Sequence, residues 1–538
     1  MFLSRAALAI VAILVTILAS PATAVGQDSA RDHRRLTSSL AEAPSLRLQF
    51  TLKRSSMKVY GQSEFYVFAN PVVSSDNTSV LYDGYAAFVN NGTDYTFLLV
   101  DGIAYFVTSP AGDANLSETA SCLDSTTIPP LNTIVSALND ATAISSVSAS
   151  DETINCSRGN LFKASFGGAD FALCASAASG FTIYGSDLDI AVEFLDEQVE
   201  ISPPTLLANA TAACETVITP TSVTETTLAL LTGKTISSST RRMLKAEADV
   251  TISSSSCSCS STPRPCIFFR GMGSTTEYNT LQTTSDYWGA IEEHAPCCSS
   301  FSYAILNTVD YAWTDAAQQK KACNFALSIS STSSATTRVV ADTIVVTHSM
   351  GGLLIAGALA NASCSFASST TWVSMSPPMG GSMSSDYQQG ACSGSNVLLE
   401  AIATLVGRCP ATTASKSLAY EGDSYSTSSL DEAYEAAQEA YRSNVNAAVC
   451  SDNYSGLLST DQLVYKLAGS LIPHKSSEND GIVEYQSCAG GLPASKFGTT
   501  YDDAFYLTGL NHADTTFRHG DALIVNSQKP VKWFECLL

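Results

Sequence analysis

A serine in the C-terminal half of this sequence stands where a hydroxyl group could act as a nucleophile. Ser349 follows the short apolar run 344–346 (Ile-Val-Val) and precedes a glycine pair, 351–352, and an apolar stretch. A strand, a sharp turn and a helix in this order lift a serine hydroxyl above the edge of a sheet. The first N–H groups of the helix then lie where an oxyanion would form. The pattern predicts nucleophilic catalysis; the alternative is a buried strand that ends in a bend.

A histidine and a carboxylate must accompany the serine, because a hydroxyl is a weak nucleophile until a base removes its proton. His512 follows the strand-like run 505–508 and lies in a polar loop, and we favour it as the base. His519 is the alternative base. Asp480 stands in an Asn-Asp-Gly turn between the serine and the histidine in chain order, and it is our candidate for the acid. Taken alone, that turn and that loop would be ordinary features.

The three motifs together resemble those of the secreted lipases of the α/β-hydrolase superfamily, over roughly residues 265–538. In order, they read Thr-His-Ser-Met-Gly at 347–351, Asn-Asp-Gly-Ile-Val at 479–483 and Asn-His-Ala-Asp at 511–514. Thr347 stands where the usual serine pentapeptide begins with glycine. The resemblance implies that Ser349 is the nucleophile, that His512 is the general base and then the acid, and that Asp480 orients the imidazole.

The same resemblance implies an oxyanion hole made by two backbone N–H groups. These belong to Met350, which follows the nucleophile, and to Met272, which lies in the loop after an early strand. Arg270 stands in that loop where relatives often carry a histidine. Some of these lipases bind calcium through a residue two positions after the histidine, here Asp514. No partner ligands are evident, so we interpret Asp514 as a structural or solvated carboxylate and expect no cofactor or metal.

Composition indicates a secreted protein of 538 residues. A short apolar run at 8–19 and the small residues at 22–24 predict a signal peptide over residues 1–24. Sixteen cysteines, an even number, predict disulfides, and Cys257, Cys259 and the pair 297–298 lack zinc-site spacing. Asn-x-Ser/Thr sequons predict glycosylation. The net charge of −22 disfavours nucleic acid and anionic membranes as partners, and no later run is long enough for a membrane anchor.

The chain divides into regions of different pattern. After a polar segment, 25–45, alternating residues predict a β-rich accessory domain at 46–215, with hairpin turns at 83–84, 91–92 and 101–102. Its cysteines suffice for two internal bridges. Residues 216–264 are Ser/Thr-rich and predict a linker. Residues 265–538 alternate between strand and helix patterns and predict an α/β-hydrolase domain, a doubly wound and mainly parallel sheet. A cap insertion is expected at about 383–470, with a helix at 430–448. The dibasic pairs at 34–35 and 241–242 are either processing sites or ordinary surface residues.

These observations favour a secreted serine ester hydrolase that acts on lipid or acyl esters through an acyl-enzyme. Two alternatives stay open. An acyltransferase or thioesterase would use the same three residues, and a secreted glycoprotein could use the same fold only for binding. The sequence does not distinguish the acyl chain length or the oligomeric state, and it assigns no role to the accessory domain.

Overall fold

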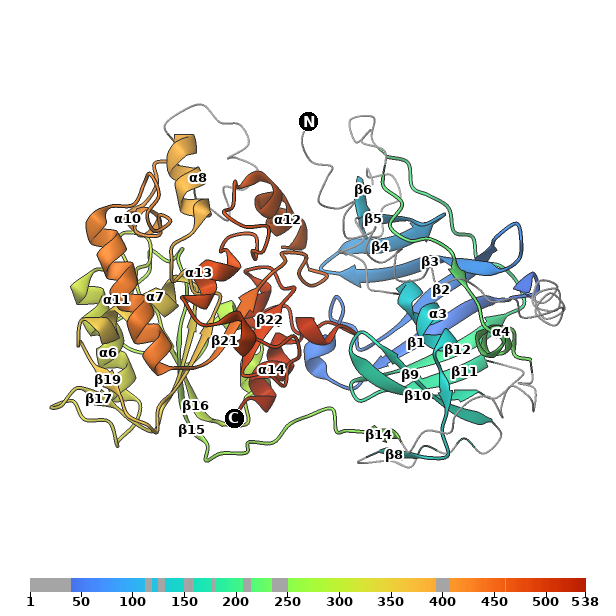
Figure 1. Ribbon diagram of the computed structural model, residues 1–538, viewed down its shortest axis with the longest axis horizontal. Helices are drawn as coiled ribbons and strands as arrows, with labels where there is room; N and C mark the ends of the chain where they lie inside the picture. The colour runs from blue at the N-terminus through green and yellow to red at the C-terminus, as the bar shows by residue number, and fades with distance from the viewer. Residues whose placement is uncertain are drawn as a thin grey trace, which may run out of the picture.

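The computed structural model contains two large β-sheets of different kinds, one in each half of the chain, and two short two-stranded sheets among the described residues (Figure 1). It describes residues 40–111, 119–123, 131–149, 154, 156, 159–175, 180–206, 214–234, 250–392, 407, 409–459 and 461–538. The predicted signal peptide and both dibasic pairs lie outside these ranges. Within them, no helix has the length and apolar character needed to cross a membrane.

The N-terminal sheet has twelve strands among the described residues and is antiparallel throughout, in the order β6-β5-β4-β3-β2-β1-β12-β11-β10-β9-β7, with β13 paired to β3. Its strands are β1 (Ser45–Leu52), β2 (Glu64–Val73), β3 (Ser79–Asn90), β4 (Thr93–Val100), β5 (Ile103–Pro110), β6 (Thr119–Leu123), β7 (Thr142–Ala143), β9 (Asn160–Phe166), β10 (Ala169–Ala175), β11 (Gly180–Tyr184), β12 (Leu188–Leu195) and β13 (Thr221–Ser222). A short parallel pair, β8 (Val147–Ala149) and β14 (Val250–Ile252), lies beside it.

Two of the three predicted hairpin turns form. Asn91 and Asp101 both adopt positive φ, of 50° and 51°, and each precedes a glycine of positive φ, as a two-residue hairpin turn requires. The third prediction, at 83–84, is wrong because those residues lie inside β3. There the carboxylate of Asp83 accepts a hydrogen bond from the backbone N–H of Asp101 at 2.8 Å, so it contacts the turn between β4 and β5 instead of making a turn itself.

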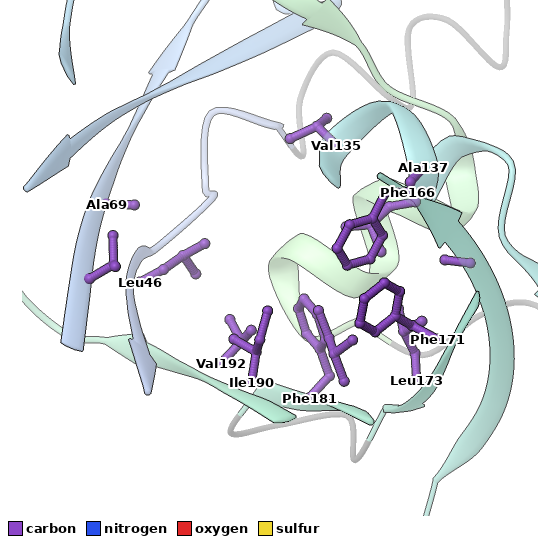
Figure 2. Close-up of a cluster of buried hydrophobic side chains, with 14 of the residues drawn as sticks. Leu46, Ala69, Val135, Ala137, Phe166, Phe171, Leu173, Phe181, Ile190 and Val192 are labelled. Atoms are coloured by element: carbon purple, nitrogen blue, oxygen red, sulfur yellow. The ribbon is translucent and has the colours of Figure 1, made fainter. Parts of the chain in front are cut away.

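One face of this sheet is covered by α3 (Leu131–Asn139) and α4 (Glu225–Thr232), which complete an apolar core with the strands (Figure 2). Phe166 and Phe171 stack in that core with ring centroids 4.0 Å apart. Helix α4 lies in the region predicted as a linker, 216–264. That prediction missed the helix because three closely spaced leucines in a Thr-rich stretch, all buried here, gave too short an apolar signal.

The C-terminal sheet has six strands, all pairs parallel, in the order β16-β15-β18-β20-β21-β22. The strands are β15 (Arg264–Phe269), β16 (Cys298–Ala304), β18 (Ile344–His348), β20 (Thr371–Met375), β21 (Val445–Ser451) and β22 (Phe505–Thr508). The helices are α6 (Ala316–Ser328), α7 (Met350–Ala360), α8 (Met383–Cys392), α10 (Thr413–Lys416), α11 (Ser428–Asn444), α12 (Gln462–Leu471), α13 (Tyr485–Ala489) and α14 (Pro530–Cys536). The α/β class predicted from sequence is confirmed.

Apolar side chains leave both faces of this sheet in alternation, as strands buried on both sides require. Val345 points into the core shared with α6, α7 and α11, whereas its neighbours Ile344 and Val346 join the opposite core, which contains α14. Helix α6 begins where Asp315 accepts hydrogen bonds from the N–H groups of Ala317 and Gln318, both at 2.9 Å, so its start matches a capping pattern.

The predicted cap insertion, 383–470, is wrong in its later part. The predicted helix at 430–448 ends at Asn444, and the following residues form β21, between β20 and β22. Helix α11 packs on α7, beside the sheet. Alanine-rich sequence continues across Asn444 without a local break, so the pattern alone could not separate the helix from the strand. Residues 428–451 therefore form a helix that packs beside the sheet and a strand within it, rather than part of an inserted cap.

Eight disulfides pair all sixteen cysteines, including the two bridges expected within the accessory domain, Cys122–Cys214 and Cys156–Cys174. The others are Cys257–Cys536, Cys259–Cys297, Cys266–Cys298, Cys323–Cys364, Cys392–Cys409 and Cys450–Cys488. Such a number is consistent with maturation in an oxidising compartment. Secretion and glycosylation stay predictions.

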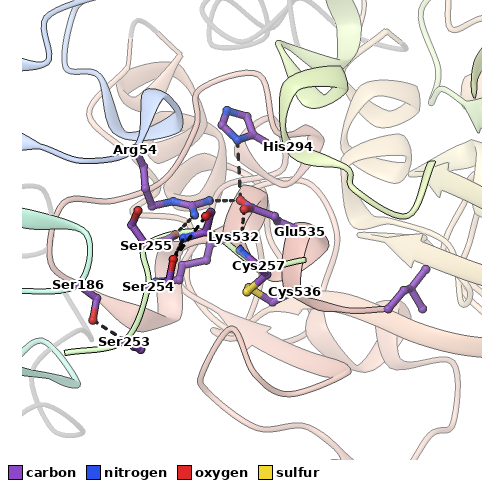
Figure 3. Close-up of a disulfide and its surroundings, with 12 residues drawn as sticks. Arg54, Ser186, Ser253, Ser254, Ser255, Cys257, His294, Lys532, Glu535 and Cys536 are labelled. Carbon is purple, nitrogen blue, oxygen red and sulfur yellow. Dashed lines mark hydrogen bonds and ion pairs between the residues drawn. A yellow bond between two sulfur atoms is a disulfide. The ribbon is translucent and has the colours of Figure 1, made fainter. Parts of the chain in front are cut away.

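The C-terminal helix lies against the N-terminal half of the chain (Figure 3). Arg54 pairs with Glu535 at 2.5 Å, and their side chains are only 3% and 6% exposed. The same helix is tied to the preceding connection by the disulfide Cys257–Cys536. Glu535 also accepts the backbone N–H of Cys257 at 2.9 Å. The two halves thus share buried charges, and the disulfide fixes the connection between them to the C-terminal helix.

Candidate active site

The turn that carries Ser349 is strained in the way its motif predicts. Ser349 has φ 54° and ψ −130°, a conformation that costs a non-glycine residue about 1–3 kcal/mol. It joins the end of β18 to the start of α7, and its N–H donates to the carbonyl of Met375 at 2.9 Å. A Cβ on Gly351 would lie 2.5 Å from the carbonyl oxygen of Phe269, so the turn packs directly on the end of β15. Only glycine fits there.

A second loop reaches the serine from β15. A Cβ on Gly271 would lie 2.7 Å from the Cβ of Ser349 and 3.1 Å from its Oγ, so this backbone touches the serine. The side chain of Thr308 supports the loop by donating to the carbonyl of Gly271 at 3.0 Å. Met272 comes next in this loop. Met350 is the first residue of α7, so its N–H has no acceptor within the helix. Of the two predicted oxyanion donors, Met350 follows Ser349 in the chain, and Met272 follows Gly271, which touches Ser349 in space.

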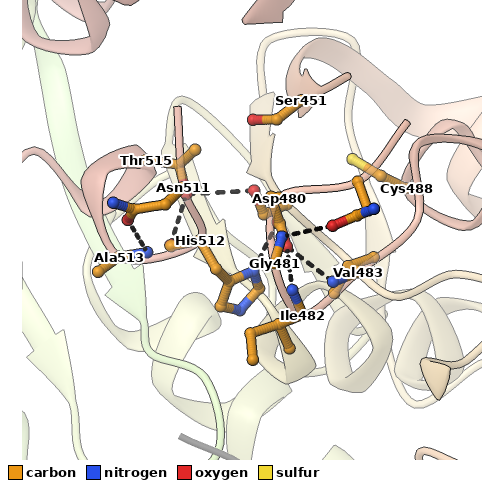
Figure 4. A network of polar contacts seen from close by, with 12 residues as sticks. Ser451, Asp480, Gly481, Ile482, Val483, Cys488, Asn511, His512, Ala513 and Thr515 are labelled. Carbon is orange, nitrogen blue, oxygen red and sulfur yellow. Dashed lines mark hydrogen bonds and ion pairs between the residues drawn. The ribbon is translucent and has the colours of Figure 1, made fainter. Parts of the chain in front are cut away.

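Asp480 and His512 meet as the sequence predicts (Figure 4). Oδ2 of Asp480 lies 2.7 Å from Nδ1 of His512, and the N–H of His512 donates to the carbonyl of Asp480 at 2.9 Å. Oδ1 accepts the N–H groups of Ile482 and Val483, at 2.9 and 2.7 Å. Asp480 is 1% exposed, so these bonds satisfy and orient a buried carboxyl group. With Nδ1–H bound to it, Nε2 of His512 is left as the basic nitrogen.

The alternative base, His519, has a different partner. Its Nδ1 lies 2.6 Å from Oδ1 of Asp514, whose Oδ2 accepts the N–H of Leu457 at 2.6 Å. Burial raises the pKa of Asp514, while its bond to His519 acts in the opposite direction. Asp514 is thus a buried structural carboxylate, which agrees with our interpretation. Within the described ranges, no group of three or more His, Cys, Asp or Glu residues is arranged to hold a metal ion.

The serine turn and the histidine loop are in contact. His348, which precedes Ser349, has Nε2 3.0 Å from the carbonyl oxygen of His512, and the two imidazole rings are 4.6 Å apart. The carboxyl ends of neighbouring parallel strands meet at one edge of the sheet, where ligands of such folds bind. The structure therefore brings Ser349, Asp480, His512 and the Gly271 loop to one place.

Sequence reasoning missed two residues of this site, Thr308 and Tyr287. Thr308 supports the Gly271 loop, and the hydroxyl of Tyr287 lies 3.2 Å from the N–H of Gly271. Neither residue stands in a recognisable motif, and both act on a loop far from them in the sequence. Only the fold reveals these contacts.

Comparison with known proteins leaves the family open. No protein-family model matches the chain, and no curated protein matches it. The solved structures that are distantly similar include three lipases. A Bacillus licheniformis lipase, BlEst2 in mature form, is 15% identical with a TM-score of 0.33, over 48% of this chain and 88% of that one. A Staphylococcus hyicus lipase is 11% identical with a TM-score of 0.28, over 51% and 95%. Lipase 1 from Pelosinus fermentans is 12% identical with a TM-score of 0.30, over 51% and 97%. Similarity this low carries no argument about function.

Proposed function

We propose that the chain is a serine hydrolase of carboxylic esters, with an α/β-hydrolase fold in its C-terminal half. The single observation that carries the proposal is the convergence at one sheet edge of a strained serine turn and a buried Asp–His pair. The strand order also supports it, because the chain passes from β15 to the outer strand β16 and then crosses back to β18, which ends at the serine. A sheet that reverses in this way opens a crevice at that point.

In the proposed reaction, the hydroxyl oxygen of Ser349 attacks the ester carbonyl while Nε2 of His512 takes the hydroxyl proton. Asp480 holds the imidazole in the tautomer that can accept this proton and stabilises the imidazolium. The N–H groups of Met272 and Met350 bind the oxyanion of the tetrahedral intermediate. The C–O bond to the alcohol then breaks, and His512 gives its proton to the departing oxygen. Water repeats the sequence on the acyl-enzyme, which releases the acid and the free serine.

We further propose that the substrates are lipid or acyl esters. Helix α12 supports this choice, since Leu463 and Leu467, one turn apart, are 45% and 37% exposed. The same helix packs against the turn that carries Asp480. A Cβ on Gly481, in that turn, would lie 2.9 Å from the carbonyl oxygen of Tyr465, in the helix. An apolar surface next to an active site suits a substrate with an acyl chain.

Hydrolysis of p-nitrophenyl esters of increasing acyl length tests the proposal. We expect activity in the secreted protein, and we expect Ser349→Ala and His512→Gln each to lower kcat by at least about 10³-fold. His294→Gln is the matched control, since His294 lies outside the site and pairs with Ser55 at 3.0 Å. A phosphonate ester should label the wild type and not Ser349→Ala. If no ester is hydrolysed and no label is incorporated, the protein is not a serine hydrolase. Transfer of the acyl group to an added alcohol or thiol in preference to water would instead indicate an acyltransferase.

A further inference from the structure

Tyr287 connects the loop beside the serine to the serine turn itself. Its hydroxyl oxygen accepts the N–H of Gly271 at 3.2 Å and lies 2.6 Å from Nδ1 of His348. Gly271 touches Ser349, and His348 is the residue directly before Ser349 in the chain. A single hydroxyl group therefore joins the two segments that surround the proposed nucleophile.

The hydrogens along this path have only one consistent arrangement. The carbonyl oxygen of His512 can only accept, so Nε2 of His348 carries the hydrogen that it donates at 3.0 Å. Nδ1 is then the acceptor, and the hydroxyl of Tyr287 must donate to it. The charged groups facing His348 agree with this. Burial first, and then the coulombic effect of His512 and Arg518, keep the pKa of His348 well below its ordinary value, while its bond to the His512 carbonyl opposes them. The imidazole is neutral, with one donor and one acceptor nitrogen.

The ring of Tyr287 contacts two cations, one from the Gly271 loop and one from the segment that follows His512. The guanidinium of Arg270, from the Gly271 loop, lies 4.5 Å from the ring centroid. The guanidinium of Arg518, from the segment after the catalytic histidine candidate, lies 4.9 Å from it. Arg518 is fixed in turn by donating from Nε to the hydroxyl of Thr516 at 2.8 Å. A guanidinium over the face of a tyrosine ring is attracted electrostatically by that ring. Arg270, which departs from the usual histidine of this loop, thus has a partner here.

We propose that Tyr287 and His348 are positioning residues, which hold the Gly271 loop and the His512 loop at a fixed spacing around Ser349. The inference rests on the proposed ester hydrolysis. The path Gly271 N–H to Tyr287, Tyr287 O–H to His348 and His348 Nε2–H to the His512 carbonyl anchors both sides of the site, and no proton moves along it. The carbonyl of His512 is held from a second side by the hydroxyl of Thr515, at 3.0 Å. Errors of about 1 Å in such placement cost about 100-fold in rate.

The variant Tyr287→Phe removes the central hydroxyl and keeps the ring. We expect kcat to fall by about 10-fold or more with KM changed by less than about 2-fold, because a buried acceptor and a backbone N–H lose their partner while the substrate pocket is untouched. Tyr441→Phe is the matched control. Tyr441 is fully buried, whereas Tyr287 is partly buried, and the hydroxyl of Tyr441 has no hydrogen-bond partner in the described part of the chain. The double variant with His348→Phe should be no slower than the slower single variant, since both break one path.

A second measurement tests this hydrogen-bond path without relying on enzyme activity. Selective ¹⁵N labelling of the six histidines should show His348 as a neutral Nε2–H tautomer at neutral pH. In Tyr287→Phe its Nδ1 resonance should shift, and in Tyr441→Phe it should not. An active enzyme in which Tyr287→Phe behaves like the control, or in which His348 titrates near its ordinary pKa, overturns the positioning role alone. A wild type that neither hydrolyses esters nor reacts with phosphonate overturns the proposed function and the positioning role with it.

Discussion

The accessory domain contributes one carboxylate that pairs with two buried lysines of the C-terminal segment. Removal of this carboxylate should lower the free energy of unfolding. Asp187 lies between β11 and β12 and pairs with Lys529 and, at 2.6 Å, with Lys532. The lysine side chains are both 3% exposed and that of Asp187 is 7% exposed. The variant Asp187→Ala would leave two ammonium groups buried without this partner.

The expected loss in the free energy of unfolding is about 3–5 kcal/mol, the usual effect of removing one member of a buried ion pair. Glu193→Ala provides the matched control in the same domain. Glu193 pairs with Arg47, but these side chains are 45% and 42% exposed, so the expected loss is about 0–1 kcal/mol. The difference between the two variants isolates the effect of burial.

Urea unfolding followed by tryptophan fluorescence measures both losses. All four tryptophans lie in the C-terminal half and are fully buried, and Trp533 belongs to α14 beside the lysines. The fluorescence therefore reports the half that Asp187 is expected to stabilise. A loss for Asp187→Ala that does not exceed the loss for Glu193→Ala would refute the argument that this contact compensates two buried charges.

The difference in stability between the wild type and Asp187→Ala should depend on pH in a predictable direction. Burial alone would raise the pKa of Asp187, but Lys529 and Lys532 together outweigh it and hold that pKa below 3.8. A carboxyl whose pKa is lower in the folded state stabilises the protein above its unfolded pKa, and this contribution disappears as the pH falls through the folded value. The advantage of the wild type over Asp187→Ala should be constant near neutrality and should shrink only below about pH 4. An advantage that shrinks as the pH rises from 4 to 7 would contradict the assigned ion pairs.

Two further predictions concern the site. Gly271→Ala should abolish ester hydrolysis with little change in melting temperature, because the new Cβ would lie 2.7 Å from the Cβ of Ser349; activity near the wild-type level would show that the loop is not in contact with the serine. Added calcium or EDTA should change neither activity nor melting temperature, because the oxygens of Asp514 are already bonded to His519 and to the N–H of Leu457. A melting temperature that rises with calcium would show that an ion site exists after all.

The sequence alone predicted the features that depend on neighbouring residues, such as short strands and turns. The predicted strand at 505–508 forms with the predicted bounds, because it is a short run rich in aromatic and apolar residues that ends before Gly509. The candidate catalytic residues could also be found, since turn chemistry and chain order are both written in the sequence. The bridging role of Tyr287 could not, because its hydroxyl contact with His348 spans 61 positions. The contact of His348 with the carbonyl of His512 spans 164 positions, and although both residues stand in motifs, neither motif predicts that the two loops touch.

The role of the accessory domain follows from where its contacts fall. They concentrate on the segment between the candidate catalytic histidine and the C-terminus. The backbone N–H of Asp521 donates to the carbonyl of Ser56 at 2.8 Å, and that of Asn526 donates to the carbonyl of Gly167 at 3.0 Å. Ile524, between them, is 2% exposed within the apolar core of the N-terminal sheet. This segment continues directly from the loop that holds His512, so the N-terminal sheet packs against the residues that follow this loop. A chain cut to residues 265–538 would expose both Ile524 and the charges that Asp187 neutralises, and we expect it to be less soluble and less active than the full protein, as gel filtration and ester hydrolysis would show.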